Sequence, residues 1–425
     1  MEKRRVVIVG AGFGGVYTYQ YVSQLLRRKK DVEIVLINPS NYFLFTPLLH
    51  EVATGGLPPE HATEPLRKIL GCRERSLVLG EVEKVFLKDK KVAVKIGDIR
   101  EDISYDILVL ASGSKANVPR VKGAEHISYT LKTMEDAVLI KNRLIEVFEK
   151  AVSLGTEEQK KLLSFVVIGG GPTGVELSAE MADLIFETFQ RYYRDTLMES
   201  VSVSLIHKDP SLLSGFSSFT QKKSLSLLQK KGINVILGKG VREVGDDFVQ
   251  LDDGTNLPSA TTIWTGGVVP VPISFDEDVA MAVGGRIATS PFLTMVGRND
   301  VFILGDMAYV EDARFPKGVP AMAQVAVQEA RLVAKNIVAT LYRKKLKTFR
   351  YRPKGELVSL GQWMAAGKAF NLSISGAFAW WVWRTVYLSK MISFTKRCKV
   401  ALDWTINIFL PRDISELYRP NNKDR

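Results

Sequence analysis

The chain has 425 residues, 46% of them hydrophobic and 24% charged, which is ordinary for a folded protein of two or three domains. Its formal net charge of +12 favours an anionic partner, such as nucleic acid, anionic lipid or an anionic cofactor. The two cysteines, Cys72 and Cys398, lie far apart, which excludes a CxxC pair and a cysteine metal site and favours a reducing compartment. Because a strand is expected at residues 5–9, we expect no signal peptide before it.

A continuous run of Val and Ile just after the N-terminus predicts a strand buried on both faces. It leads into the spacing G-x-G-x-x-G at Gly10, Gly12 and Gly15. In dinucleotide-binding folds these glycines permit a tight turn, admit the pyrophosphate and let the next helix pack closely, with its N-terminus aimed at the phosphates. The next strand is expected at residues 32–37. It ends at Asn38, where an acid usually binds the ribose, and an amide can also hydrogen-bond a ribose hydroxyl.

The same pattern of strand, glycine turn and helix recurs in the middle of the chain, at Gly169, Gly171 and Gly174. The ribose position is then occupied by His207, followed by Lys208; no carboxylate occupies it, and the first acid is Asp209. One copy is compatible with a tight turn in an ordinary α/β domain. Two copies imply two dinucleotides, and a flavin and a nicotinamide are the natural pair because one can pass a hydride to the other.

Two further segments favour a flavin. Residues 105–113 read as a buried strand ending in small residues, Ser112 and Gly113, which suits a crossover beside a cofactor. Residues 301–304 read as a strand followed by Gly305 and Asp306. Asp306 is predicted to accept a hydrogen bond from a ribityl hydroxyl; the alternative is a helix N-cap.

With these features the chain resembles the type II NADH dehydrogenases, which are single-subunit NADH:quinone oxidoreductases without proton pumping. The resemblance covers almost the whole chain. It is most specific in AQVAVQ, which is similar to the family's quinone-site motif, and in the tail. The motifs that carry it are NYFLFTPLLH at 41–50, IWTGGV at 263–268, LGD at 304–306, AQVAVQ at 323–328 and VALDW at 400–404.

The resemblance implies an α/β fold with two Rossmann-like dinucleotide-binding domains, of the pyridine nucleotide-disulfide reductase type, and a C-terminal amphipathic helical segment that anchors to a membrane. It implies an FAD-binding domain at 1–115 and 285–350, an NAD(P)H-binding domain at 116–284, and a membrane-interface region at 355–425. The implied cofactor-binding residues are Gly10, Gly12, Phe13, Gly14, Gly15, Asn38, Thr46, Pro47, Leu48, Ser112, Gly113, Gly305 and Asp306 for FAD, and Gly169, Gly171, Thr173, Gly174, His207, Lys208 and Gly266 for NADH or NADPH.

Three residues are implied for catalysis. Carried over from the family, Glu176 steers or relays protons to the reduced quinone; the alternative is an acid in the first helical turn, favoured by the helix dipole. Gln324 and Gln328 lie four residues apart on one helical face, where their amides can hydrogen-bond a quinone carbonyl without adding charge. Their alternative is the polar face of a surface helix.

The C-terminal region is rich in aromatic and basic residues. Five of the six tryptophans fall between Trp363 and Trp404, and the longest uncharged stretch there, 369–383, is shorter than the roughly 20 residues of a membrane span. The basic residues are Arg384, Lys390, Lys396, Arg397 and Lys399, and the apolar stripe that follows is Leu402, Ile406, Phe409 and Leu410. We therefore expect a helix that lies in the interface of an anionic membrane. A homodimer interface is the alternative, and the two roles are compatible.

These inferences predict a flavin-dependent NAD(P)H:quinone oxidoreductase, peripheral to the cytoplasmic face of the cell membrane, with no nucleic-acid partner and no metal. A disulfide reductase is disfavoured because no cysteine pair accompanies the first turn. Two alternatives stay open. One is sulfide:quinone oxidoreduction, which two isolated cysteines fit poorly. The other is a slow-turnover flavoprotein that acts as a redox sensor or scaffold.

Overall fold

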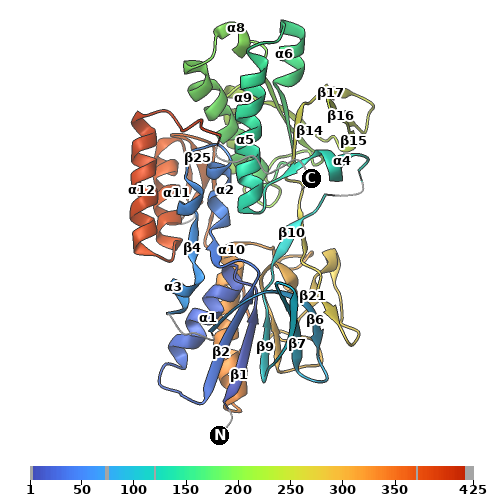
Figure 1. Ribbon diagram of the computed structural model, residues 1–425, viewed down its shortest axis with the longest axis vertical. Helices are drawn as coiled ribbons and strands as arrows, with labels where there is room; N and C mark the ends of the chain where they lie inside the picture. Colours follow the sequence, from blue (N-terminus) through green and yellow to red (C-terminus); the bar gives the residue numbers. More distant parts are fainter. Residues whose placement is uncertain (1–2, 72–75, 119–120, 370–371, 417–425) are drawn as a thin grey trace. The chain divides into compact units, whose positions relative to one another are not determined.

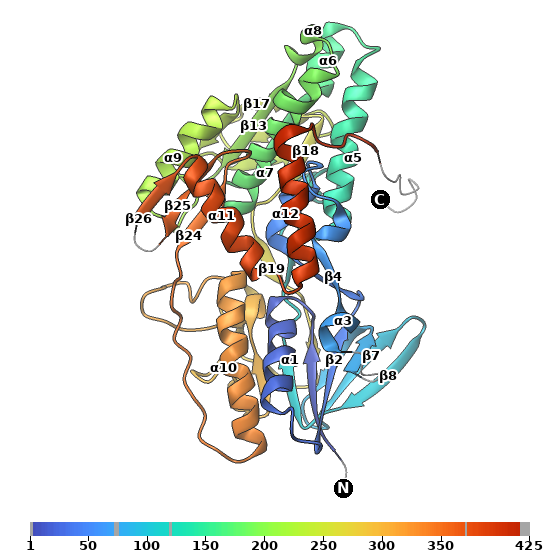
Figure 2. The same cartoon turned by 90° about the vertical axis from the view of Figure 1, so that its left-hand side faces the viewer.

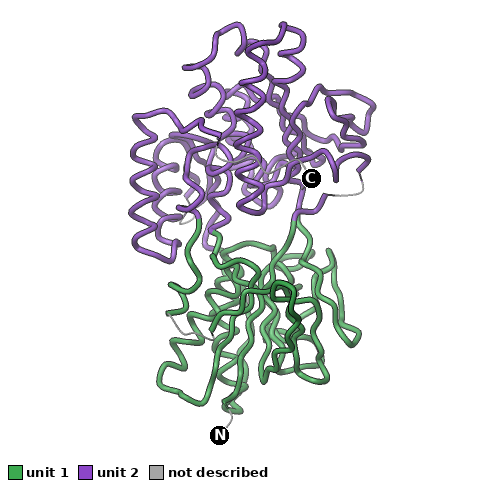
Figure 3. Tube along the Cα trace, in the orientation of Figure 1, with its two compact units in different colours: residues 1–44, 63–115, 268–353 green, residues 45–62, 116–267, 354–425 purple. Residues whose placement is uncertain are grey.

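The computed structural model describes residues 3–71, 76–118, 121–369 and 372–416. The chain forms two compact units, coloured separately in Figure 3. Unit 1 contains residues 1–44, 63–115 and 268–353, and unit 2 contains residues 45–62, 116–267 and 354–425. Each unit has its own parallel sheet, which is the arrangement that two Rossmann-like halves require.

The parallel sheet of unit 1 has the strand order β22-β9-β1-β2-β5. The run of Val and Ile near the N-terminus forms β1, and its last four residues are buried, as predicted. Two helices pack against each other in this unit, α1 and α10 (Figure 1). The bounds are β1 (Arg4–Val9), β2 (Val32–Asn38), β5 (Leu77–Leu79), β9 (Ile107–Leu110), β22 (Val301–Ile303), α1 (Phe13–Leu25), α3 (Leu66–Leu70) and α10 (Ala323–Leu341).

Unit 1 also holds smaller sheets. A four-stranded sheet has the order β20-β6-β7-β8, and three strand pairs complete the unit. The bounds are β6 (Glu81–Phe86), β7 (Lys91–Ile96), β8 (Ile99–Ser104) and β20 (Ser274–Phe275); then β3 (Tyr42–Leu44) with β4 (Thr63–Pro65), β10 (Ser114–Ala116) with β19 (Val268–Pro270), and β21 (Ile287–Ala288) with β23 (Ala308–Tyr309).

The parallel sheet of unit 2 has the order β11-β18-β12-β13-β14, and two antiparallel three-stranded sheets, β15-β16-β17 and β24-β25-β26, accompany it. The strand bounds are β11 (Tyr129–Thr130), β12 (Ser164–Ile168), β13 (Ser202–His207), β14 (Asn234–Leu237), β15 (Val241–Val244), β16 (Phe248–Leu251), β17 (Asn256–Pro258), β18 (Thr261–Trp264), β24 (Glu356–Ser359), β25 (Ala365–Ala369) and β26 (Leu372–Ser375). The helices are α2 (Leu49–Val52), α4 (Ala124–Ile127), α5 (Met134–Ala151), α6 (Thr156–Leu162), α7 (Pro172–Asp183), α8 (Asp195–Met198), α9 (Ser218–Lys230), α11 (Ala377–Lys390) and α12 (Phe394–Phe409).

The compact units divide the chain at different places from the domains inferred from sequence. Residues 268–284, predicted to lie with the nicotinamide domain, belong to unit 1, because β20 hydrogen-bonds to β6 there. Residues 45–62, predicted to lie with the flavin domain, belong to unit 2, where α2 packs against α5 and α7. The C-terminal region also belongs to unit 2, because β25 packs against α9 and α11.

The C-terminal region is more deeply buried than the sequence suggested. Trp380, Trp383 and Trp404 are only 1–3% exposed, whereas Trp363 and Trp381 are 41% and 51% exposed. Most of the proposed aromatic anchors are therefore core side chains of unit 2. Arg384 is buried as well, with its guanidinium over the rings of Trp380 and Trp404, so it does not serve as a basic flank.

Helix α12 lies beside α11 (Figure 2). One stripe of its apolar side chains is exposed. Leu402, Ile406 and Phe409 are 60%, 42% and 77% exposed, while Val400 and Trp404 are buried. Within the described ranges, no helix combines the length and the apolar character that crossing a membrane requires.

Candidate active site

The first glycine turn has the geometry of a phosphate cradle. Gly10 has φ +94°, and a Cβ there would lie 2.4 Å from the Ala111 carbonyl oxygen. A Cβ on Gly15 would lie 1.8 Å from the Gly10 oxygen, so both positions require glycine. At Gly12 a Cβ would meet no atom within 4 Å, and α1 begins at the next residue, Phe13. Open space therefore faces the N-terminus of α1, where a pyrophosphate fits.

The second turn repeats this geometry in unit 2. Gly169 has φ +119°, and a Cβ there would lie 2.8 Å from the Gly266 nitrogen. A Cβ on Gly174 would lie 1.8 Å from the Gly169 oxygen, whereas at Gly171 it would meet nothing within 4 Å. Helix α7 begins directly afterwards, at Pro172. The chain thus builds two cradles that both fit a dinucleotide phosphate.

The residue at the end of the second strand of each Rossmann unit stabilises its own turn. Asn38 Oδ1 accepts a hydrogen bond from the Ala11 N–H at 2.9 Å, and its Nδ2 donates to Ser40. His207 Nδ1 accepts from the Gly170 N–H at 3.1 Å. Both side chains are therefore partly committed to the turn before any ribose binds.

The hydrogen bond to Gly170 also sets the tautomer of His207. Because Nδ1 is an acceptor, the ring hydrogen lies on Nε2, which is 3.5 Å from Asp209 Oδ2. Burial lowers the pKa of His207, and Asp209 opposes that effect, so the imidazole is neutral at pH 7. The positive charge in this pair comes from Lys208, which is exposed.

At the proposed ribityl end of unit 1, Asp306 lies in a 3₁₀ turn, Gly305–Met307, and not at the N-cap of an α-helix. Ser114 Oγ donates a hydrogen bond to Asp306. The Gly305 N–H donates to Glu329 Oε2 at 2.6 Å, and Glu329 is 1% exposed, so burial raises its pKa to about 8. Sequence reasoning missed Glu329, although an acid directly after AQVAVQ was an available signal.

The two glutamines of α10 have different surroundings. Gln328 Nε2 donates to the Arg352 oxygen at 3.0 Å, and its Oε1 accepts from the Arg352 N–H at 3.2 Å. This amide therefore fastens the segment around Arg352 to α10. The Gln324 Nε2 has only a weak sulfur acceptor among the described residues, Met322 Sδ at 4.0 Å. Its amide is less committed than that of Gln328, so Gln324 is the better candidate for binding a ligand.

Glu176 lies in a group of buried ionisable residues in unit 2. It follows the first turn of α7 and is 8% exposed. Its Oε1 accepts from the Ser359 N–H at 3.1 Å, and its Oε2 lies 3.8 Å from His50 Nδ1. Burial raises the pKa of Glu176 to about 8, with a further contribution from Glu180 and Glu51, so the carboxyl group is protonated at neutral pH.

Other members of this group come from distant parts of the chain. Glu51 Oε2 accepts from Trp404 Nε1 at 2.6 Å, and burial raises the pKa of Glu51 to about 7. Glu180 forms a buried ion pair with Arg412. Burial raises the pKa of Glu180, but the charge and hydrogen bond of Arg412, together with His50 and Lys231, outweigh it and lower the pKa. Sequence reasoning missed these residues and His50. The available signal was the pair of ionisable residues in the otherwise apolar stretch at 47–53.

The remaining predicted residues fall in both units. In unit 1, Phe13 contacts Phe43 edge-on, a Cβ on Gly14 would lie 3.3 Å from the Leu304 side chain, and Ser112 and Gly113 follow β9. Thr46, Pro47 and Leu48 form a 3₁₀ turn that belongs to unit 2, not to the unit of the first glycine turn. Thr173 is exposed in the first turn of α7, and Cys72 lies outside the described residues.

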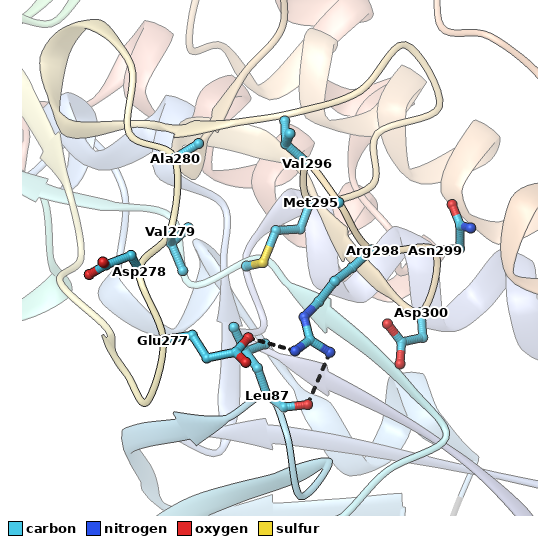
Figure 4. A pocket seen from close by; sticks show the side chains of 11 residues that line it. Leu87, Glu277, Asp278, Val279, Ala280, Met295, Val296, Arg298, Asn299 and Asp300 are labelled. Atoms are coloured by element: carbon cyan, nitrogen blue, oxygen red, sulfur yellow. Dashed lines mark hydrogen bonds and ion pairs between the residues drawn. The ribbon is translucent and has the colours of Figure 1, made fainter.

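A polar pocket of about 460 Å³ occurs elsewhere in unit 1 (Figure 4). Arg298 crosses it, bonded to Glu277 and to the Leu87 oxygen. Asp300, in its wall, directly precedes β22. The pocket thus lies at the amino end of that parallel strand, whereas nucleotides bind at the carboxyl ends. It is not the candidate site.

Comparison with known proteins agrees with this arrangement. The pyridine nucleotide-disulphide oxidoreductase model matches residues 4–330, and the NDH2 C-terminal domain model matches residues 354–413. A probable NADH dehydrogenase of Dictyostelium discoideum is 31% identical, over 98% of this chain and 92% of that protein. The type II NADH:quinone oxidoreductase Ndh of Mycobacterium tuberculosis is 30% identical, over 97% and 89%. The chain belongs to the type II NADH dehydrogenase family.

The fold of this type II NADH dehydrogenase is also that of a solved structure. NDH2 of Plasmodium falciparum, in complex with NADH, superposes with a TM-score of 0.88 at 22% identity, covering 97% of this chain and 100% of that one. The family and the α/β fold class predicted from the motifs are therefore confirmed, including the C-terminal domain.

Proposed function

We propose that this type II NADH dehydrogenase oxidises NADH or NADPH and reduces a quinone, with FAD held at the first glycine turn and the nicotinamide nucleotide at the second. The observation that carries the proposal is the pair of cradles, each with an open glycine at a helix N-terminus. When bound, FAD supplies a hydride acceptor that passes two electrons onward. The name of the Mycobacterium tuberculosis relative supports the same reaction.

The protein's own groups would orient the ligands and supply a proton. Asp306, held by Ser114 and by the turn that Glu329 fixes, would accept from a flavin hydroxyl. Gln324 would hydrogen-bond a quinone carbonyl. Glu176, protonated at neutral pH, would give its proton to the reduced quinone.

We also propose that the protein binds peripherally to an anionic membrane, on the cytoplasmic face. The outward apolar face of α12 supports this, as do the exposed Lys390 and Lys399. Lys396 and Arg397 contribute less, because their side chains donate to backbone oxygens of Glu60 and Met391.

The decisive experiment is anaerobic reduction of the purified flavoprotein by NADH, NADPH and sulfide in parallel. We expect the flavin absorbance to bleach with NADH or NADPH and to return when a soluble quinone is added. Bleaching by sulfide but by neither nucleotide would instead support sulfide:quinone oxidoreduction. Slow reoxidation by every quinone would support a sensor or scaffold.

A further inference from the structure

The buried group in unit 2 contains more ionisable side chains than the proposed reaction uses. His50 is 3% exposed, and its Nδ1 lies 3.8 Å from Glu176 Oε2. On the other side of the ring, Nε2 is buried without a hydrogen-bond partner among the described residues. Leaving a buried polar atom unpaired costs free energy, so a side chain kept only for packing would be better without it.

Packing holds this ring in place. His50 is in the short helix α2, which packs against α7, the helix that carries Glu176. The indole of Trp383 contacts the imidazole edge-on, with centroids 6.1 Å apart. The distance between the His50 ring and Glu176 is therefore set by two helices and an indole, and a small side-chain rotation would bring the two groups into hydrogen-bond contact.

A small pocket lies in the same buried group. It is lined by Glu51, the residue after His50, and by Ser359, whose N–H donates to Glu176. The pocket volume of about 20 Å³ is enough for one water molecule. The carboxylates of Glu51 and Glu180 line it, together with the guanidinium groups of Arg384 and Arg412. Most of the other lining residues are buried, but Gln362 and Asn407 are half-buried, so the pocket reaches towards the surface.

The charges that face His50 determine its resting state. Burial lowers the pKa of His50 to about 4; Glu180 raises it and Arg412 lowers it. The imidazole is therefore neutral at pH 7, with one nitrogen able to accept a proton, while Glu176 is protonated. The buried ionisable residues of the elements packed around it are Glu176, Glu180 and Asp183 on α7, Glu51 on α2, Lys141 on α5 and Arg384 on α11; Tyr387 on α11 and Arg412 add a phenol and a second guanidinium.

We propose that His50, supplied through Glu51 and the water-sized pocket, returns a proton to Glu176 after each turnover. His50 would then be a positioning and relay residue that acts through Glu176, and the inference rests on the proposed quinone reduction. The overall reaction, NAD(P)H + H⁺ + quinone → NAD(P)⁺ + quinol, takes up one proton from water per turnover.

The relay passes one proton from water through His50 to Glu176. After Glu176 has given its proton to a quinol oxygen, a water molecule supplied from the pocket protonates His50 at Nε2. The N–H bond at Nδ1 breaks, and an O–H bond forms at Glu176 Oε2. His50 then carries its hydrogen on Nε2, and exchange of one proton with water restores the Nδ1–H tautomer before the next turnover. The hydroxide left behind is neutralised by exchange with Glu51 and bulk water, so no ion accumulates in the core.

The test separates the two half-reactions by stopped-flow spectroscopy of the flavoprotein. For His50→Gln we expect normal flavin bleaching by NAD(P)H. Reoxidation by a soluble quinone should slow by about tenfold, which is less than the roughly 100-fold or greater cost of losing a direct proton donor. In the variant, but not in the wild type, reoxidation should speed up with buffer concentration, because buffer acids replace the relay. His126→Gln, at an exposed position of α4, is the matched control and should behave as the wild type.

Two further results complete the test. Glu51→Gln keeps an acceptor for Trp404 but loses the proton, and it should show the same buffer dependence; it decides the question if His50→Gln does not fold. Reoxidation as fast as in the wild type in both variants, or a loss that no buffer restores, would overturn the relay. A wild-type protein that neither nucleotide reduces, or no quinone reoxidises, would refute the proposed function itself.

Discussion

The carboxyl group of Glu176 links stability to pH. Its pKa is raised to about 8, so between about pH 4.3, the ordinary value for Glu, and pH 8 the folded chain holds a proton that the unfolded chain has lost. Stability from this group therefore falls as the pH rises. In Glu176→Gln the amide still accepts from Ser359 and cannot ionise. We expect the variant to gain stability over the wild type progressively between pH 5 and 8, measured by urea unfolding, while losing quinone-reductase activity. The matched control, Glu125→Gln on α4, should show no such trend.

Nucleotide choice also depends on single residues. Because His207 is neutral and bonded to Gly170, attraction for a 2′-phosphate must come from Lys208. We expect NADPH to be a substrate, and Lys208→Glu to lower kcat/KM for NADPH relative to NADH by about five- to 150-fold. His207→Asn gives this position the residue type that its equivalent, Asn38, has in unit 1. The amide keeps an acceptor for the Gly170 N–H, so the NADPH/NADH ratio should change little. An NADPH/NADH ratio that is the same in Lys208→Glu and the wild type would show that this lysine does not contact the nucleotide.

At the scale of an element, α12 packs a face with both polar and apolar side chains against the rest of unit 2. Asn407 donates to the Gly56 oxygen at 2.6 Å, and Asp403 pairs with His61, while the apolar stripe faces out. Burying each such side chain in lipid contributes about 1.5–3 kcal/mol. We therefore expect the triple substitution of Leu402, Ile406 and Phe409 by Ser to abolish co-sedimentation with anionic liposomes and to leave the flavin content unchanged.

The control for α12 removes exposed apolar groups elsewhere in the same unit. Val152→Ser with Leu154→Ser, just after α5, should leave liposome binding intact. Full sedimentation of the α12 variant would place the membrane contact on another surface. Deleting the whole tail would not answer this question, because it would remove Trp380, Trp383 and Trp404 from the core.

At the scale of the molecule, Arg412 closes unit 2 by joining three distant segments. It pairs with Glu180 on α7 and donates to Thr54 Oγ1 at 2.9 Å. Removing one partner of a buried ion pair costs about 3–5 kcal/mol, so Arg412→Ala should lower the stability of unit 2 by that amount. Arg412→Lys should restore it in part, since an ammonium lacks the guanidinium fork.

The chain offers a separate probe for each unit in this measurement. All six tryptophans lie in unit 2, so their fluorescence follows its unfolding. The flavin signal should follow unit 1, which holds the first glycine turn and Asp306. If both probes reported one common unfolding transition, lowered equally by Arg412→Ala, the two units would not unfold independently. If Arg412→Ala changed neither the tryptophan transition nor the flavin transition, the ion pair would not stabilise unit 2.

The sequence by itself determined the local features of this protein. Gly10 and Gly15 predict the turn because a Cβ at either position would clash with the backbone. The clash of Gly15 is with Gly10, a few residues away, and that of Gly10 is with Ala111, which directly follows an adjacent strand. The buried run of Val and Ile before the turn, and the AQVAVQ stretch of α10, likewise carry their information within a short window. The family could therefore be predicted from motifs, and the comparisons confirm it.

Only the tertiary structure decided which side chains are committed and which are buried. Gln328 looked equivalent to Gln324 until the fold placed Arg352 against its amide. Three tail tryptophans looked like membrane anchors until packing buried them. The arrangement of His50, Glu176 and Arg412 brings together segments from the start, middle and end of the chain. Burial and charge set their pKa values, and both depend on long-range packing that no local pattern encodes.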